Sequence, residues 1–140
     1  MLMILAHDLN FGIGKDNFIP WKCPDDLKHF RKVTMGKDLI VGRVTATDLP
    51  PLKNRRVFIV SRIGMSIEDA INHSTDPVII GGKQVYEYCL DQNLVTEIVV
   101  TVINQITECD TFIRSNYADG FDLYKTEQID SGEIRYYKNL

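Results

Sequence analysis

The apolar residues of this chain gather in short runs that polar segments separate. Five of these runs are nearly continuous, and about four to eight apolar residues in a row are typical of a strand buried on both faces. Such strands belong to sheets that have helices on both sides. The pattern predicts strands over residues 2–6, 38–42, 56–61, 77–80 and 97–103.

Short helices are predicted between these strands. Pro24 stands where a first-turn proline belongs, because its missing N–H would be unpaired there anyway. Ser66 is suited to cap a later helix, and Asp69 occupies the capping-box position, where it is weaker than Glu. Residues 7–18 are rich in glycine and asparagine and are expected to form a long loop. The predicted helices cover residues 24–33, 43–49, 66–71 and 83–90.

The order of the elements predicts the fold class. Strands that alternate with short helices indicate an α/β protein with a mostly parallel, twisted central sheet and flanking helices. Residues 121–124 and 134–137 are expected to form an antiparallel C-terminal hairpin. The 140 residues correspond to one domain, so we expect a single domain over residues 1–140.

Composition and charge exclude several classes of partner. The net charge of −3 gives no general signature of nucleic-acid or anionic-membrane binding. No apolar run approaches the roughly 20 residues of a membrane span, and the N-terminus meets charge too early for a signal peptide. The chain has three cysteines, Cys23, Cys89 and Cys109, and their spacing matches neither a metal site nor a disulfide framework. We therefore expect reduced thiols, a cytoplasmic protein and no bound metal. The histidines also lack ligand spacing and are expected in solvated or capping roles: His7, His29 and His73.

Two junctions repeat one pattern, in which a buried strand ends in glycine and a helix follows at once. They are Val41-Gly42-Arg43-Val44-Thr45 and Ile80-Gly81-Gly82-Lys83-Gln84. Glycine lets an anion approach the backbone, and a helix start offers free N–H groups and a positive dipole end. Arg43 adds a positive fork and Thr45 a hydroxyl. Each junction alone could be an ordinary strand-to-helix turn, but the pair favours binding of the two phosphates of a dinucleotide. Neither is a P-loop, and Gly12-Ile13-Gly14 lacks the third glycine of a Rossmann fingerprint.

One acid stands among apolar residues where the helix at 24–33 begins. On a helix, Asp26 shares a face with Phe30, and Leu27 lies about a quarter-turn away. Asp26 could complement the helix dipole in solvent, or it could line an apolar pocket, where desolvation would raise its pKa toward the range of a general acid. The pattern leaves both interpretations open, whereas its neighbour Asp25 is expected to be a solvated first-turn acid. The basic run at 53–56 likewise has two interpretations, a solvated edge or capture of a carboxylate by one arginine.

The ordered set of motifs resembles dihydrofolate reductase over nearly the full length. Each segment alone is weak, but their order is highly specific. The matching segments are Gly-Ile-Gly-Lys-Asp-Asn at 12–17, Pro20-Trp21, Pro24-x-Asp26-Leu27-x-x-Phe30, Val41-Gly42-Arg43-x-Thr45, Arg55, Val60-Ser61, Ile80-Gly81-Gly82-x-x-Val85-Tyr86, Thr101 and Asp110-Thr111.

The resemblance implies reduction of 7,8-dihydrofolate to tetrahydrofolate by hydride from NADPH. Asp26 matches the family's acidic pocket residue, which promotes protonation of the pterin, and Trp21 and Thr101 match positions that support this acid. Tyr86 matches a residue beside the nicotinamide, and Arg55 matches the arginine that pairs with the glutamate α-carboxylate. The implied substrate-binding set is Ile4, Ala6, Asp26, Leu27, Phe30, Arg55, Ile80 and Thr101.

The resemblance also implies a cofactor site. Gly81-Gly82 is commonly a cis peptide in the family, residues 8–23 match a mobile loop that closes over the nicotinamide, and residues 109–111 match a loop that steadies it. The implied cofactor-binding set is Ala6, Ile13, Gly14, Gly42, Arg43, Val44, Thr45, Ser61, Arg62, Ile80, Gly81, Gly82, Gln84, Val85 and Tyr86.

The sequence departs from the family pattern on the adenosine side. Only four residues, 62–65, separate the third predicted strand from the helix at Ser66, where the family usually has another edge strand. Ala46 replaces a larger residue and Gln84 a basic one, for which Arg62 could compensate. These changes bear on cofactor affinity and on preference for NADPH over NADH.

Two rival functions are compatible with the same fold. One is the pyrimidine reductase of riboflavin synthesis, against which the acid-bearing helix and Arg55 argue. The other is a non-catalytic folate- or nucleotide-binding structural module. We expect a monomer that takes dihydrofolate as a small-molecule substrate and binds neither nucleic acid nor membranes.

Overall fold

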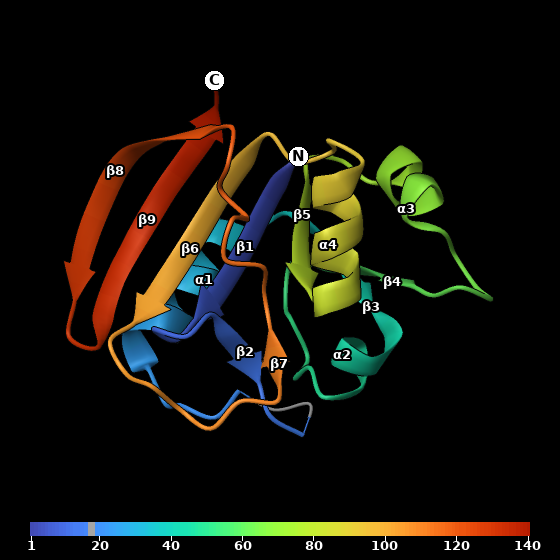
Figure 1. Cartoon of the computed structure of the whole chain (residues 1–140). Helices are drawn as coiled ribbons and strands as arrows, with labels where there is room; N and C mark the ends of the chain where they lie inside the picture. The colour runs from blue at the N-terminus through green and yellow to red at the C-terminus, as the bar shows by residue number, and fades with distance from the viewer. Residues whose placement is uncertain (17–18) are drawn as a thin grey trace.

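The computed structural model describes residues 1–16 and 19–140 (Figure 1). Within the described residues it contains two sheets and four helices. The elements are β1 (Leu2–His7), β2 (Gly12–Gly14), α1 (Pro24–Thr34), β3 (Asp38–Gly42), α2 (Arg43–Thr47), β4 (Arg56–Val60), α3 (Ile67–His73), β5 (Pro77–Gly81), α4 (Lys83–Asp91), β6 (Glu97–Ile103), β7 (Thr111–Phe112), β8 (Phe121–Ile129) and β9 (Gly132–Asn139).

The central sheet has seven strands in the order β4-β3-β5-β1-β6-β9-β8. The five strands from β4 to β6 are parallel, and β9 is antiparallel to both β6 and β8. The predicted α/β class, the mostly parallel sheet and the antiparallel C-terminal hairpin are therefore confirmed. A second sheet pairs only β2 with β7.

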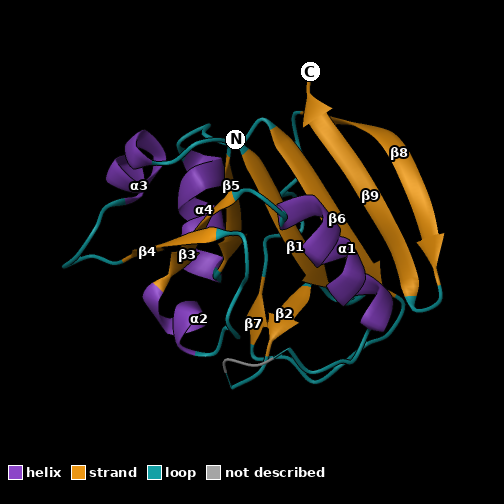
Figure 2. Ribbon diagram, turned by 180° about the vertical axis from the view of Figure 1, so that it is seen from behind, coloured by secondary structure: helices purple, strands orange, loops and turns teal. Residues whose placement is uncertain are grey.

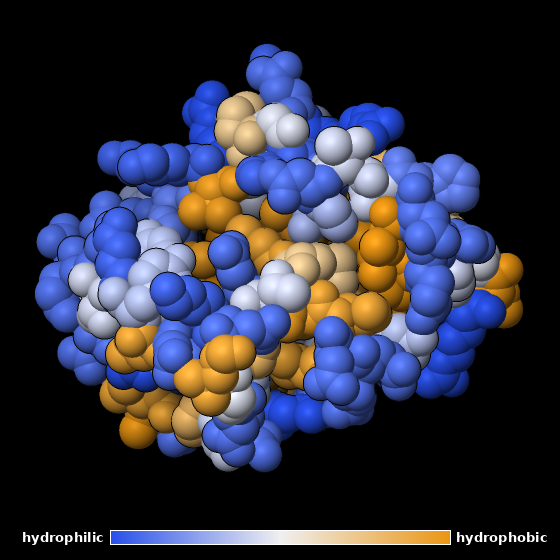
Figure 3. All heavy atoms as spheres, turned by 90° about the horizontal axis from the view of Figure 1, so that it is seen from above, coloured by the Kyte–Doolittle hydropathy of each residue, from blue (hydrophilic) through white to orange (hydrophobic). Residues whose placement is uncertain are grey.

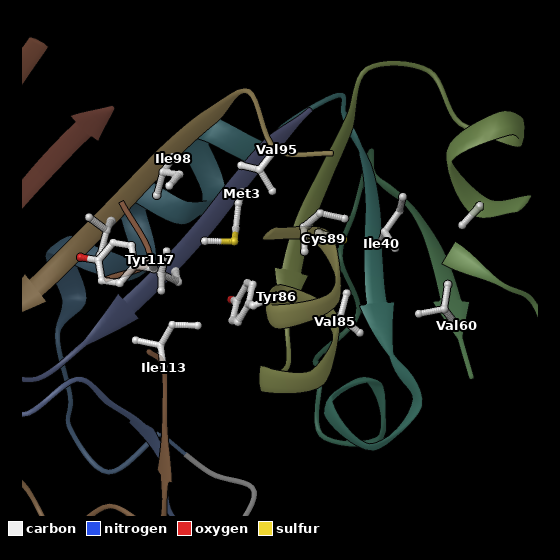
Figure 4. Packing of buried hydrophobic residues seen from close by; sticks show 14 of the residues in the cluster. Met3, Ile40, Val60, Val85, Tyr86, Cys89, Val95, Ile98, Ile113 and Tyr117 are labelled. Atoms are coloured by element: carbon white, nitrogen blue, oxygen red, sulfur yellow. The ribbon is translucent and has the colours of Figure 1, made fainter. Parts of the chain in front are cut away.

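Helices cover both faces of the sheet. In Figure 1, α4 lies in front of the sheet and α1 behind it, and Figure 2 shows the same arrangement from the other side. Alternate residues of β1 face the two helices: Met3 and Leu5 pack in the cluster with Val85 of α4, whereas Ile4 packs in the cluster with Phe30 of α1. Figure 4 shows the α4 side of this core, with Val85 and Tyr86 pointing from the helix toward the sheet. This burial on both faces explains why these strands have continuous apolar sequences.

Local signals placed most elements to within about two residues, but the long loop predicted over residues 7–18 is partly wrong. Three of its residues form β2, which pairs with β7 through Gly12 and Gly14. The pattern missed β2 because it is short and glycine-rich, and its pairing partner lies about a hundred residues later in the chain. Asn17 and Phe18, which belong to this loop and to the 12–17 motif, lie outside the described residues.

The helix at Ser66 begins as predicted. The backbone N–H of Asp69 donates to Ser66 Oγ over 3.0 Å, which satisfies one of the unpaired donors at the helix start.

The short connection between β4 and α3 has a visible consequence. Residues 61–66, which the structure describes, contain no strand, so β4 is the edge of the sheet. Val57 and Ile59 of β4 are 38% and 51% exposed.

The view from above in Figure 3 shows the end of the sheet where the chain begins, with an apolar area framed by hydrophilic residues. Of the described helices, none combines the length and the apolar character needed to cross a membrane.

Two histidines differ from the prediction. His7 is 2% exposed, and its ring bonds to the Tyr117 hydroxyl over 2.8 Å and to the carbonyl oxygen of Asp8 over 2.6 Å. His29 is 9% exposed. Both are buried in the fold because neighbouring aromatic rings, Phe11 and Tyr117 around His7 and Tyr136 beside His29, cover them. Ligand spacing alone could not reveal this burial.

Candidate active site

A large cavity runs along the carboxyl ends of the parallel strands β4, β3, β5 and β1. Its volume is about 1290 Å³. All fifteen residues that the resemblance assigned to cofactor binding line it, including Ala6 from β1, Arg43 from α2 and Tyr86 from α4. The carboxyl ends of parallel strands are the place where open α/β sheets bind ligands.

The two glycine junctions meet at the middle of this cavity. Gly42 is the N-cap of α2 and Gly82 is the N-cap of α4. A Cβ added to Gly82 would lie 2.7 Å from Thr45 Oγ1, and one added to Gly42 would lie 3.2 Å from a methyl group of Val85. The two helix starts are therefore packed together through the positions that have no side chain, and both expose N–H groups toward the same space.

The bond between Gly81 and Gly82 is cis, as the resemblance predicted. Gly81 has φ +127°, a conformation that L side chains rarely adopt, and the Tyr86 hydroxyl lies 3.3 Å from the position of its missing Cβ. A glycine is needed here both for its backbone angle and for this close approach.

Tyr86 ties α4 to the first strand of the sheet. Its hydroxyl donates to the carbonyl oxygen of Ile4 over 2.9 Å, and the ring is buried. Burial, with a smaller contribution from the nearby charge of Asp26, raises the pKa of Tyr86. Its hydroxyl is therefore a neutral donor at neutral pH.

Asp26 lies in the first turn of α1, half-buried rather than solvated. Burial raises the pKa of its carboxyl group, although the hydroxyl of Thr101 and the proximity of His29 act in the opposite direction. Of the two interpretations that the sequence left open, the structure favours the apolar pocket over the solvated dipole role. Thr101 is paired with Ala6 in the β1–β6 ladder, and Ala6 lines the cavity, so the carboxyl group lies beside the wall of the cavity.

The apolar residues expected beside Asp26 differ in burial. Trp21 is 8% exposed and packs with Cys23 and Ile103. Phe30 is half-buried beneath the sheet, but Leu27 is 67% exposed and stands free of the packed core. Trp21, Leu27 and Phe30 lie on α1 or just before it, and none of them is among the residues that line the large cavity.

Arg55 lies at the far end of the same helix. Its Nη1 donates to Thr34 Oγ1 over 3.1 Å, and its Nε donates to the carbonyl oxygen of Lys53 over 3.1 Å. The guanidinium group is thus fixed at the last turn of α1, whereas Asp26 occupies the first turn. Asp26 and the fixed cation of Arg55 therefore lie at opposite ends of α1.

Comparisons with known proteins decide the family. The family model described as dihydrofolate reductase matches residues 1–139. The chain belongs to the dihydrofolate reductase family. A dihydrofolate reductase of Ureaplasma parvum is 32% identical over 98% of this chain and 96% of its own length, and one of Staphylococcus aureus is 35% identical over 79% of this chain and 75% of its own.

Another relative in this family is longer. A bifunctional dihydrofolate reductase-thymidylate synthase of Paramecium tetraurelia is 35% identical over 92% of this chain, which spans only 31% of that relative. A solved dihydrofolate reductase of Enterococcus faecalis, complexed with NADP(H) and RAB-propyl, has the same fold, with a TM-score of 0.85 and 22% identity over 99% of this chain and 95% of that one.

The structure also reveals residues near this dihydrofolate reductase site that the sequence did not single out. His29 lies one turn after Asp26, and its Nε2 is buried without a hydrogen-bond partner among the described residues. Tyr88 lines the cavity and donates to Glu68. Asp8 is fully buried immediately after β1. In the sequence, the only indication for Asp8 is that an acid directly follows a predicted buried strand. The sequence pattern does not indicate how the side chains of His29 and Tyr88 are oriented.

Proposed function

We propose that this chain reduces 7,8-dihydrofolate to 5,6,7,8-tetrahydrofolate with hydride from NADPH. One observation carries the proposal: a half-buried acid of raised pKa adjoins a cavity in which two helix starts meet through glycines. Such a site suits a reaction that adds one hydride and one proton in a space that excludes water. Relatives named dihydrofolate reductase favour this function over the pyrimidine reductase.

The residues at the two glycine junctions fit a dinucleotide. Gly42, Gly81 and Gly82 let Val85, Tyr86 and Thr45 pack closely against the backbone of the junctions, and Arg43 and Thr45 add a cation and a hydroxyl beside the helix starts. Bound NADPH would supply the hydride. Ala6, Ile13, Gly14 and Ile80 are proposed to surround its nicotinamide end. The remaining proposed cofactor residues are Val44, Ser61, Arg62, Gln84, Val85 and Tyr86.

Asp26 is proposed to promote protonation of the pterin. Its raised pKa brings the carboxyl group closer to the range of a useful proton donor, and the hydroxyl of Thr101 lies beside it. Trp21 is proposed to support this acid from the segment just before α1. Ile4, Ala6 and Ile80 are proposed to form the pocket wall, with Leu27 and Phe30 covering the apolar part of the substrate. The exposure of Leu27 is consistent with a wall that packs against substrate rather than against protein.

Arg55 is proposed to bind the α-carboxylate of the glutamate tail. A guanidinium group that is already held by Thr34 and by a carbonyl oxygen loses less freedom when it forms a paired contact with a carboxylate. Its place at the opposite end of α1 from Asp26 would make the substrate lie along this helix.

We further propose that the chain acts as a monomer in the cytoplasm.

Turnover tests the proposal directly. The purified chain is mixed with dihydrofolate and NADPH, and oxidation of NADPH is followed by absorbance at the reduced nicotinamide band. We expect oxidation that depends on both compounds and that a folate antagonist blocks. Absence of turnover at high enzyme and substrate concentrations would exclude the enzyme, and tight binding without turnover would favour the non-catalytic module.

A further inference from the structure

Asp8 is a fully buried carboxylate that follows β1 directly. Its Oδ1 accepts hydrogen bonds from the backbone N–H groups of Asn10 and Gly12 over 2.9 and 2.8 Å. Its Oδ2 accepts from the N–H and the hydroxyl of Thr107 over 2.9 and 2.7 Å. The Cys109 thiol adds a longer contact to Oδ2 over 3.9 Å. These bonds occupy the acceptor sites of an ionised carboxylate, and none of the ion pairs among the described residues involves Asp8.

The two oxygens of Asp8 hold two different segments of the chain. Oδ1 binds the segment that leads into β2, and Oδ2 binds the segment that leads into β7. The same segments are joined by the backbone bond from Leu9 N–H to the carbonyl oxygen of Gln105, over 2.9 Å. Figure 1 shows β2 and β7 side by side below the end of β1.

These segments form one wall of the cavity. Ile13 and Gly14 of β2 and Thr111 of β7 line it. Gly12, which donates to Asp8, packs so closely on Cys109 that an added Cβ would clash with the sulfur. A shift of Asp8 would therefore move both strands of this wall together.

We propose that Asp8 is a positioning residue that fixes the Ile13–Gly14 wall against the bound cofactor. The inference rests on the proposed function, because it deepens the account of the same site. Asp8 touches neither substrate nor the cavity, and it acts through the backbone of β2 and the segment before β7. Its place is set two residues after Ala6, which lines the same cavity beside Thr101.

The charge of Asp8 is part of this arrangement. Burial alone would raise the pKa of its carboxyl group, but the hydrogen bonds from Thr107, Gly12 and Asn10 outweigh burial and lower the pKa. Asn at this position has one acceptor oxygen, and its NH₂ group would face the N–H of Thr107. The change Asp8→Asn would therefore break the link to one segment while preserving size.

The test compares Asp8→Asn with a matched control, Asp38→Asn. Asp38 is another buried carboxylate, 6% exposed, which accepts from Arg56 Nε over 2.9 Å and from Thr75 N–H over 2.6 Å. It begins β3, at the opposite end of that strand from Gly42 and the cavity. Both variants lose a buried charge and structural hydrogen bonds, but only one disturbs the cavity wall.

The measurements are the Kd of NADPH by fluorescence titration and the rate of hydride transfer in a single turnover with NADPH or its deuterated form. For Asp8→Asn we expect each to worsen by about tenfold or more, since small misplacements of reacting groups cost this much. The KM for dihydrofolate should stay within about twofold, and Asp38→Asn should match wild type in both measurements.

A milder variant covers the case in which Asp8→Asn does not fold. Thr107→Val removes one donor to Asp8 with little change of shape, and we expect about a threefold weaker Kd for NADPH. If NADPH binds equally well to wild type and to whichever of the two variants folds, the inference about Asp8 is wrong. Because the binding measurement needs no turnover, a wild-type chain that binds NADPH without reducing dihydrofolate would overturn the proposed function and still decide the role of Asp8.

Discussion

The role of Asp26 in protonation of the substrate can be tested with one substitution. We expect Asp26→Asn to lose about a hundredfold or more of the turnover rate near neutral pH, because the amide cannot promote protonation of the substrate. The loss should shrink in acid, where solvent can protonate the substrate. The measurement is the pH profile of kcat/KM for both proteins, and a variant as active as wild type at neutral pH would remove Asp26 from the mechanism.

The same substitution should act on stability in a pH-dependent direction. Because the pKa of Asp26 is raised in the folded protein from its usual 3.8, the folded state holds its proton more tightly than the unfolded state. The contribution of Asp26 is therefore fully favourable below its unfolded pKa and is lost as pH rises through the folded pKa. We expect Asp26→Asn to unfold at higher urea concentration than wild type at neutral pH, and the difference to narrow in acid. A variant less stable than wild type at neutral pH would contradict the assigned burial.

The residues around Asp26 show how far the sequence could be interpreted at this scale. Helical spacing placed Asp26 and Phe30 on one side of α1, but the same spacing could not distinguish a solvated acid from a buried one. That difference depends on burial beside Thr101, which belongs to β6, far from Asp26 in the sequence. The burial of Asp8 has the same origin, since two of the hydrogen bonds to its carboxylate come from Thr107, about a hundred residues away.

At the scale of the elements, local signals located what local interactions stabilise. Ser66 caps α3 through the N–H of Asp69, and this contact involves residues only three apart. We expect Ser66→Ala to lower the free energy of unfolding by about 1 kcal/mol, measured by urea denaturation. Ser131, outside the helices, provides a control whose change to Ala should have a smaller effect on stability. Equal losses at both positions would show that the cap contributes nothing of its own.

The elements that the sequence missed are stabilised by distant partners. β2 and β7 are three and two residues long, and neither has an apolar run or an alternating pattern. They form because Asp8 and the β2–β7 ladder bring their segments together. By contrast, the inner strands β1, β3, β5 and β6 are buried on both faces, and their continuous apolar sequences made them predictable.

At the scale of the whole molecule, the shortened edge at β4 leaves one end of the cavity with fewer walls. Arg43 follows Gly42, Arg62 follows β4, and both line this cavity, so two cations remain where β3 and β4 end. NADPH carries one phosphate more than NADH, and we expect these cations to favour it despite the missing strand. Because a ligand stabilises the folded state by mass action, NADPH at a hundredfold excess over its Kd should contribute about 2.7 kcal/mol to the free energy of unfolding.

The melting temperature of the chain with equal concentrations of NADPH or NADH measures this preference. We expect a clearly larger increase with NADPH, and a smaller difference between the two cofactors in Arg43→Gln and in Arg62→Gln. Arg31→Gln, on the exposed surface of α1, is the matched control and should keep the wild-type difference. Equal increases of the melting temperature with both cofactors in the wild-type chain would contradict this prediction. They would mean that, without the missing strand, the site does not distinguish NADPH from NADH. The shortened edge would then have changed which cofactor the protein selects, while the pocket around Asp26 stayed intact.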